Sequence, residues 1–270
     1  MKLGIAFNIF NGEELLLDSL IRLRPLADYI VLTYQNTSNV GNSSDRDIAS
    51  ELKKLPSYLY DDLILFEPKL YIRAKKNEVK KRNLGLNYAK KNKCSHFMSI
   101  DCDEFYNKEE FELAKQIIIE NDYDTTACEL VNYFHDSKFQ MIEKKQYVPF
   151  IFKISWFRKH KYSCRFPVVV DRTRSVQSNN FYCFKEDELL MHHMSYVRKN
   201  NNSMKSKLLN SPNNKLFIGH MDEYLSYYND WDESQPALNP HQFIERKSFV
   251  SPNVIEQQNP IKLSISYVKS

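Results

Sequence analysis

A cluster of acids follows one short apolar segment, and its spacing suits a site for a cation or a phosphate. Residues 97–100 (FMSI) run directly into Asp101, Cys102, Asp103 and Glu104. If the apolar segment is a buried strand, these acids lie at its carboxyl end, where ligands gather in open α/β sheets. Two carboxylates one residue apart can coordinate a divalent cation and hold a diphosphate. A solvated acidic turn is the alternative, because the D-x-D pattern is short and common.

The segments around this acidic turn predict alternating strands and helices. Strands are expected at residues 2–7, 28–33, 63–66 and 97–100, and helices at 12–26, 45–55 and 72–91. Such alternation favours a parallel sheet with helical crossovers. Beyond the turn we expect a helix at 108–121 and strands at 125–133, 147–154, 166–170 and 189–197, followed by short helices at 203–210 and 220–231. The pattern predicts an α/β protein with helices on both faces of the sheet, a mixed sheet in its second half and a C-terminal helical extension.

Composition narrows the class of protein. The 270 residues are 42% hydrophobic, carry a net charge of +4 and include only five glycines. No G-x-G-x-x-G or Walker lysine motif is present, which argues against a dinucleotide or P-loop enzyme. Five scattered cysteines without a C-x-x-C pair indicate neither a disulfide framework nor a zinc knuckle, and favour a reducing cytosol. No stretch approaches the length of a membrane span, and the N-terminal segment lacks the cleavage site of a signal peptide.

Three segments together resemble the GT-A-fold glycosyltransferases, especially bacterial or phage members similar to family 2. They are the N-terminal strand with its Asn-Gly-Glu-Glu helix entry, the segment KKRNLGLNYAKKNKCSHFMSIDCDEF, and the later MHHMSYVRKN. In that family an Arg-Asn-x-Gly helix precedes the D-x-D strand, and Arg82, Asn83 and Gly85 stand at the corresponding interval before Asp101. The resemblance implies a GT-A-like catalytic domain over 1–199, with a nucleotide-sugar half at 1–106, an acceptor half at 107–199 and an extension at 200–270.

The resemblance also implies roles for individual residues in binding the donor. The expected donor-binding residues are Asn8, Gln35, Asn36, Arg82, Asp101 and Arg198. The family usually has an aspartate where Gln35 and Asn36 stand, but an amide also satisfies a uracil edge, so a UDP-sugar is favoured as donor.

The expected metal ligands are Asp101, Asp103 and His193, which would hold Mn²⁺ or Mg²⁺. Neighbouring residues of a strand face opposite ways, so only one of His192 and His193 can point into the site. The H-x-S-Y-V-R spacing selects His193, whose imidazole favours manganese. Replacing Asp103 by alanine is expected to abolish turnover and leave the fold intact.

An inverting transfer also needs a carboxylate that takes the proton of the acceptor hydroxyl. Asp187, in a Glu-Asp pair before the late strand, is the first choice, and Asp171 is the reserve. Among the aromatic residues, Trp231 is a candidate wall for the acceptor. The lysines of residues 75–81 are expected on a solvated helix face, with Arg82 as the exception.

The function implied is metal-dependent transfer of a sugar from a nucleotide diphosphate to a hydroxyl acceptor. A glycan or a lipid-linked acceptor, as in surface polysaccharide or lipopolysaccharide synthesis, is the favoured partner, with the protein in the cytoplasm and peripheral at the membrane surface. One alternative is a glycosyltransferase that acts on modified bases of phage DNA, a nucleic acid partner whose binding would depend strongly on salt. A nucleotidyltransferase and a non-catalytic nucleotide- or glycan-binding module are the others.

Overall fold

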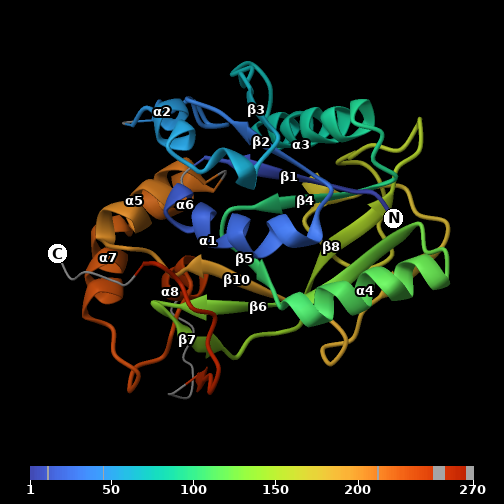
Figure 1. Ribbon diagram of the computed structural model, residues 1–270. Helices are drawn as coiled ribbons and strands as arrows, with labels where there is room; N and C mark the ends of the chain where they lie inside the picture. Colours follow the sequence, from blue (N-terminus) through green and yellow to red (C-terminus); the bar gives the residue numbers. More distant parts are fainter. Residues whose placement is uncertain (11, 45, 212, 246–252, 266–270) are drawn as a thin grey trace.

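The computed structural model describes residues 1–270 apart from 11, 45, 212, 246–252 and 266–270. A mixed sheet with helices on both faces forms its centre (Figure 1). The main path of this sheet has the strand order β11-β7-β6-β8-β4-β1-β2-β3, while β10 pairs with β5 and β6, and β9 pairs with β6. The strands are β1 (Leu3–Ile9), β2 (Tyr29–Tyr34), β3 (Asp62–Leu65), β4 (His96–Asp101), β5 (Glu104–Tyr106), β6 (Thr125–Phe134), β7 (Asp136–Met141), β8 (Gln146–Lys153), β9 (Phe181–Cys183), β10 (Leu190–Tyr196) and β11 (Val254–Glu256).

The first hundred residues form the parallel part of the sheet, as the sequence predicts. Strands β3, β2, β1 and β4 are parallel neighbours in that order. The helices between them are α1 (Glu13–Leu23), α2 (Ile48–Lys53) and α3 (Ala74–Lys91). Alternate residues of β1 enter different cores: Ile5 and Phe7 belong to the core on one face, and Ala6 belongs to the core that includes Leu86 and Ala89 of α3. This period of two explains why the strands read as nearly continuous apolar runs.

The second half adds antiparallel strands around β6. Strand β8 runs antiparallel to both β4 and β6, whereas β10 is parallel to β6 and antiparallel to the short β5. Helix α4 (Lys108–Glu120) lies where it was predicted. The strand predicted at 166–170 is wrong, because these residues have no regular structure and belong to a long loop between β8 and the short helix η3 (Arg172–Arg174). Strands β5, β7, β9 and β11 were not predicted.

The C-terminal residues form a helical cluster beside β7 and β10. It contains α5 (Asn201–Asn210), α6 (Asn214–Ile218), α7 (Met221–Asp230) and α8 (Pro240–Ile244). Trp231 is only 4% exposed and packs edge-on against Phe134 and Phe139. The interpretation of Trp231 as an acceptor wall is therefore wrong, because the residue belongs to the core of this cluster. All five cysteines are unpaired, and among the described residues no helix has the length and hydrophobicity to cross a membrane.

Candidate functional site

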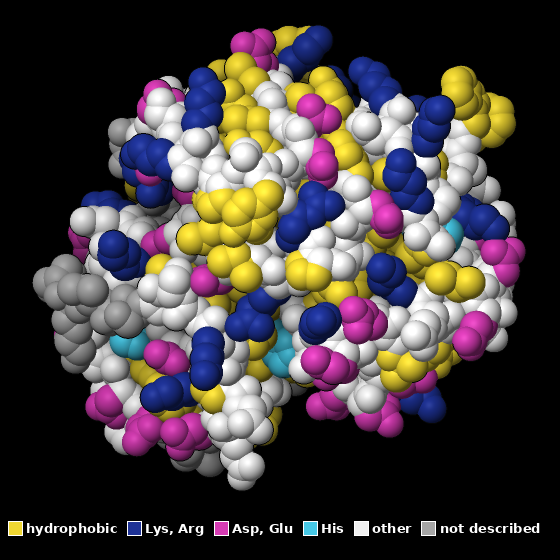
Figure 2. Space-filling model, in the orientation of Figure 1, with side chains coloured by type: hydrophobic (Ala, Val, Ile, Leu, Met, Phe, Trp, Pro, Cys, Tyr) yellow, Lys and Arg dark blue, Asp and Glu magenta, His cyan; other side chains and the backbone are white. Residues whose placement is uncertain are grey.

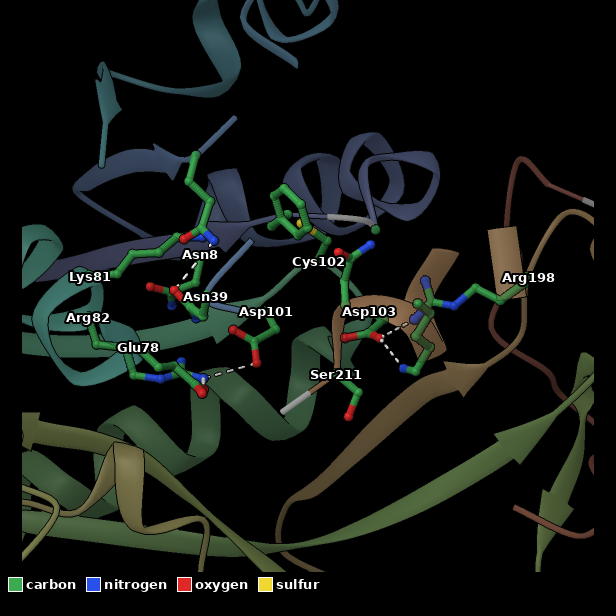
Figure 3. A pocket seen from close by; sticks show the side chains of 15 residues that line it. Asn8, Asn39, Glu78, Lys81, Arg82, Asp101, Cys102, Asp103, Arg198 and Ser211 are labelled. Carbon is green, nitrogen blue, oxygen red and sulfur yellow. Dashed lines mark hydrogen bonds and ion pairs between the residues drawn. The ribbon is translucent and has the colours of Figure 1, made fainter. Parts of the chain in front are cut away.

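A cavity of about 290 Å³ opens at the carboxyl ends of the parallel strands (Figure 3). Asn8 of β1, Asp101 of β4 and Arg82 of α3 contribute to its lining. Other lining residues are Phe10, Gly12, Gln35, Asn39, Glu78, Lys81, Cys102, Asp103, Arg198, Lys207, Asn210 and Ser211. The cavity thus joins the predicted nucleotide-binding half to helix α5 of the C-terminal extension.

Two arginines hold Asp101 at the edge of this cavity. The Oδ2 atom of Asp101 accepts hydrogen bonds from Arg82 at 3.1 Å and from Arg174 of η3 at 2.6 Å. Burial acts to raise the pKa of Asp101, but the two guanidinium groups outweigh it and lower the pKa to about 2. Arg174 also pairs with the buried Glu104. Asp101 is therefore a fixed negative charge whose Oδ2 is already engaged.

The Arg-Asn-x-Gly segment of α3 has a structural reason at each position. Arg82 is 1% exposed and also donates to Ser99, which orients its guanidinium towards Asp101. Asn83 bonds the backbone of His160 through both its amide nitrogen and its amide oxygen, which anchors the β8–η3 loop to α3. A Cβ at Gly85 would lie 2.4 Å from the Cβ of Ala6, so only glycine allows α3 to pack this closely on the sheet.

Asp103 lies in a second ionic group, beside α5. Its Oδ2 accepts a hydrogen bond from Arg198 at 2.6 Å, and the Lys207 ammonium is 3.5 Å away. Burial opposes ionisation of Asp103, but Lys207, His193 and Arg198 keep its pKa well below the usual value. Arg198 is 2% exposed, and its Nη1 has no hydrogen-bond partner among the described residues, although Glu14 lies 3.8 Å away. This guanidinium therefore retains a donor for a further ligand.

His193 faces Asp103 with a defined tautomer. The pairing of β10 with β5 places His193 opposite Glu104, and its Nε2 lies 3.6 Å from Oδ1 of Asp103. The other ring nitrogen contacts Oδ1 of Asn132 at 2.8 Å, and the Asn132 amide donates to Glu143 at 2.6 Å. Because the Asn132 oxygen can only accept, Nδ1 of His193 carries the proton and Nε2 keeps its lone pair. Two electron-pair donors then face each other, an arrangement that a cation stabilises.

His192 points to the opposite side of β10, as expected for a neighbour in a strand. Its Nδ1 contacts the hydroxyl of Tyr133 at 2.7 Å, and burial lowers its pKa to about 4. His192 is therefore a buried histidine outside the cavity.

The donor atoms present fit a divalent cation bound by two protein ligands and completed by a substrate. Catalytic magnesium sites commonly use one or two carboxylates together with phosphate oxygens. Asp103 and His193 meet this description, whereas Asp101 is held by its two arginines. Within the described ranges, no group of three or more His, Cys, Asp or Glu side chains is placed to hold a metal. The three-residue ligand set predicted from the sequence therefore stays a prediction, with two of its members in contact distance.

Two amide oxygens in the cavity wall are buried without a hydrogen-bond partner among the described residues. They are Oδ1 of Asn8 and Oε1 of Gln35. The amide nitrogens of both residues are engaged: Asn8 donates to Ser99 at 2.9 Å, and Gln35 donates to the carbonyl of Thr37 at 2.9 Å. Orphaned buried acceptors are costly unless a ligand or water supplies a donor. Asn36, the other predicted base-reading residue, is exposed and does not line the cavity.

Lys81 was expected on a solvated helix face, and this expectation is wrong. It is 4% exposed and lines the cavity, and its ammonium donates to the carbonyl of Ile9 at 2.9 Å. No carboxylate of the described chain lies within ion-pair distance of it. Burial lowers its pKa to about 8, although Asp101 partly opposes the shift. A desolvated ammonium of this kind favours an anionic ligand.

A larger cavity, of about 1440 Å³, lies on the other side of Asp101 and shares this residue with the first. Asp171, Arg174 and His193 are part of its lining. Asp171 is exposed, and its carboxylate accepts from the backbone amide and the hydroxyl of Thr173. Asp187, the first choice for the catalytic base, lies in an exposed turn after β9 and lines neither cavity.

Several cavity residues were not predicted as functional. Lys207 comes from α5, and Arg174 comes from the β8–η3 loop. Glu78 of α3 bonds Arg82 at 2.8 Å and accepts from the hydroxyl of Thr173. Only the DRTR segment, which contains Asp171, offered a sequence signal near any of these residues.

The comparisons with known proteins find similarity in structure but not in sequence. No protein-family model matches the chain, and no curated protein matches it. The fold is similar to that of residues 1–349 of S. aureus TarS, with a TM-score of 0.47 and 13% identity over 91% of this chain and 73% of the TarS chain. The complexes of the same protein with UDP and with UDP-GlcNAc give TM-scores of 0.44 and 0.43 at 14% and 13% identity. They cover 87% and 84% of this chain, and 74% and 71% of the TarS chain.

TarS is a glycosyltransferase with a GT-A-like fold, the fold that the sequence resemblance predicts. Because all three TM-scores are below 0.5, the function of this chain has to be argued from the residues of its own site.

Proposed function

We propose that the chain transfers a sugar from a nucleotide diphosphate to a hydroxyl group of an acceptor. The observation that carries this proposal is the pair of cavities that meet at Asp101. One cavity offers buried cations and orphaned amide oxygens, which suit a phosphorylated nucleotide, and the larger one leaves room for a second substrate. A transferase needs two such adjacent sites, because its donor and acceptor must be held in contact.

The donor occupies the smaller cavity in this proposal. Oε1 of Gln35 accepts an N–H group of the base, and a uracil ring presents one. Lys81, Arg198 and Lys207 surround the diphosphate and offset the negative charge that grows on it as the bond to the sugar breaks. Asp103 and His193 are the residues that would hold Mg²⁺ or Mn²⁺, and such an ion would neutralise further charge on the leaving group.

The acceptor occupies the larger cavity. Its hydroxyl oxygen forms the new bond to the anomeric carbon of the sugar while the bond from that carbon to the diphosphate oxygen breaks. Asp171 takes the hydroxyl proton, since it is the predicted base that lines this cavity. A glycan or lipid-linked glycan is the proposed acceptor, which fits a role in the synthesis of surface polysaccharide.

The test is a panel of sugar nucleotides incubated with the protein, with and without Mn²⁺, followed by analysis of products. We expect release of nucleoside diphosphate, and loss of this release in Lys207→Met and Asp103→Asn variants that remain folded. Lys215→Met, on the nearby helix α6 but outside both cavity linings, is the matched control. Pyrophosphate as product would instead support a nucleotidyltransferase, and binding without any product would support a non-catalytic module.

A further inference from the structure

Two aromatic side chains project from the surface in the β8–η3 loop. Trp156 is 87% exposed and its neighbour Phe157 is 85% exposed. Burying side chains of this size is strongly favourable in water, so adjacent and almost fully exposed aromatic residues mark a contact surface. In Figure 2, hydrophobic side chains stand out from the outline of the molecule at the position of this loop in Figure 1.

Basic side chains surround the aromatic pair. Lys159, Lys161 and Arg165 are exposed on the same loop, and none of them forms an ion pair within the part of the chain that the structure describes. The end of α3 adds further charge, because the ammonium of Lys90 donates to the carbonyl of Trp156 at 3.4 Å and to that of Arg158 at 3.0 Å. Lys91 follows on the same exposed end.

The acids beside this surface are already neutralised. Asp124 pairs with Arg158 at 2.6 Å, and Asp122 pairs with Lys153 at 2.7 Å. The surface therefore combines an apolar tip with an excess of positive charge. Proteins that bind the face of an anionic membrane use the same combination, with aromatic rings at the headgroup level and lysines or arginines near the lipid phosphates.

We propose that this surface, defined by Trp156, Phe157, Lys159, Lys161, Arg165, Lys90 and Lys91, docks on an anionic lipid bilayer. The same loop continues into residues 167–170, which line the larger cavity, and Val169 among them is 90% exposed. Docking would therefore bring the opening of this cavity close to the lipid headgroups, where a lipid-linked acceptor is available. The docking itself does not depend on sugar transfer, so it can be measured without turnover.

The two tryptophans of the chain allow a direct measurement. Trp156 is exposed, whereas Trp231 is 4% exposed, so a change in emission on adding lipid reports on Trp156. Phosphatidylcholine vesicles with and without phosphatidylglycerol are the probe. With the anionic vesicles we expect a blue shift of the emission, quenching by brominated acyl chains and co-sedimentation of the protein. We expect neither the shift nor co-sedimentation with phosphatidylcholine alone.

Variants separate the surface from a general attraction to lipid. The double variant Trp156→Ser/Phe157→Ser should bind anionic vesicles at least tenfold more weakly, and Lys159→Glu/Lys161→Glu should bind them more weakly with the aromatic pair intact. Tyr58→Ser removes another aromatic ring that is 73% exposed, and it should bind as the unmodified protein does. All variants should unfold at the same temperature, because these side chains make few contacts.

Three outcomes would overturn the proposal. The first is equal binding by the unmodified protein and the double serine variant, and the second is an equal loss in Tyr58→Ser. The third is a dimer in solution that the double serine variant abolishes, because the aromatic pair would then contact a second copy of the chain.

Discussion

Replacing Lys81 by methionine should stabilise the protein and weaken its binding of nucleotide. Burial lowers the pKa of this lysine from 10.5 to about 8. Each pKa unit corresponds to about 1.4 kcal/mol, so holding the buried ammonium charged at pH 7 costs the folded state about 3 kcal/mol. Methionine removes this cost but leaves the Ile9 carbonyl without its donor, a loss of about 1 kcal/mol. A net gain of about 2 kcal/mol corresponds to a rise in Tm of about 4–8 °C.

The same substitution removes a charge from the proposed diphosphate site. A hydrogen bond to a charged group contributes about 1.5–3 kcal/mol, so the Kd for a nucleoside diphosphate should rise about 10- to 100-fold. Thermal unfolding followed by circular dichroism and titration calorimetry with UDP give the two quantities. Lys80→Met is the matched control, because Lys80 is the exposed neighbour on the same helix and should change neither value.

The pH dependence of the stability difference tests the cause. Below pH 8 the lysine is charged in both the folded and the unfolded chain, and the cost of burial is fully present. Between pH 8 and 10.5 the unfolded chain binds more protons than the folded one, so the unmodified protein gains stability as the pH rises. The advantage of Lys81→Met should therefore shrink over this interval. A variant that is less stable than the unmodified protein, or that binds UDP equally well, would refute the reasoning.

Three further substitutions test other parts of the site. Gly85→Ala forces α3 away from the sheet and should lower the free energy of unfolding by about 1–3 kcal/mol, whereas Gly219→Ala, with open space around its Cβ, should be tolerated in the same chemical denaturation. Asp103→Ala should abolish turnover and also destabilise the fold by about 3 kcal/mol, since it leaves a buried arginine without its partner, and an unchanged Tm would contradict this ion pair. His193→Gln should reduce Mn²⁺ binding measured by electron paramagnetic resonance, while His192→Gln should leave it unchanged; equal effects would remove His193 as a ligand.

The expectation that Asp103→Ala leaves the fold intact is thus revised by the structure. From the sequence, Asp103 is one of two acids in a turn, and its removal appears harmless to the fold. In the folded chain it is 8% exposed and bonded to Arg198, which lies ninety-five positions later. The cost of losing a carboxylate depends on the charge that it leaves behind, and this partner comes from a distant segment.

The sequence was sufficient for the parallel part of the sheet and for the position of the acidic turn. Strand and helix periodicities are local properties, and four apolar runs separated by helices leave few ways to build a sheet. The carboxyl ends of parallel strands meet at one edge, so Asn8, Gln35 and Asp101 could be expected near one another. The antiparallel strands β5, β7, β9 and β11 escaped prediction because they are short or polar and are stabilised mainly by pairing with distant strands.

The identity of the cations at the site depends on packing between distant segments. Lysines at positions 80 and 81 look alike in the sequence, yet the rotation of α3 against the sheet exposes the first and buries the second. Arg174 and Lys207 enter through a loop and a helix whose local sequences carry no signal for a site. The types of residue and their local periodicity thus specify which elements form and where each chain segment can present polar groups. Burial and electrostatic partnership arise from contacts across the whole chain, and these contacts decide which of those groups carry an uncompensated charge into the cavity.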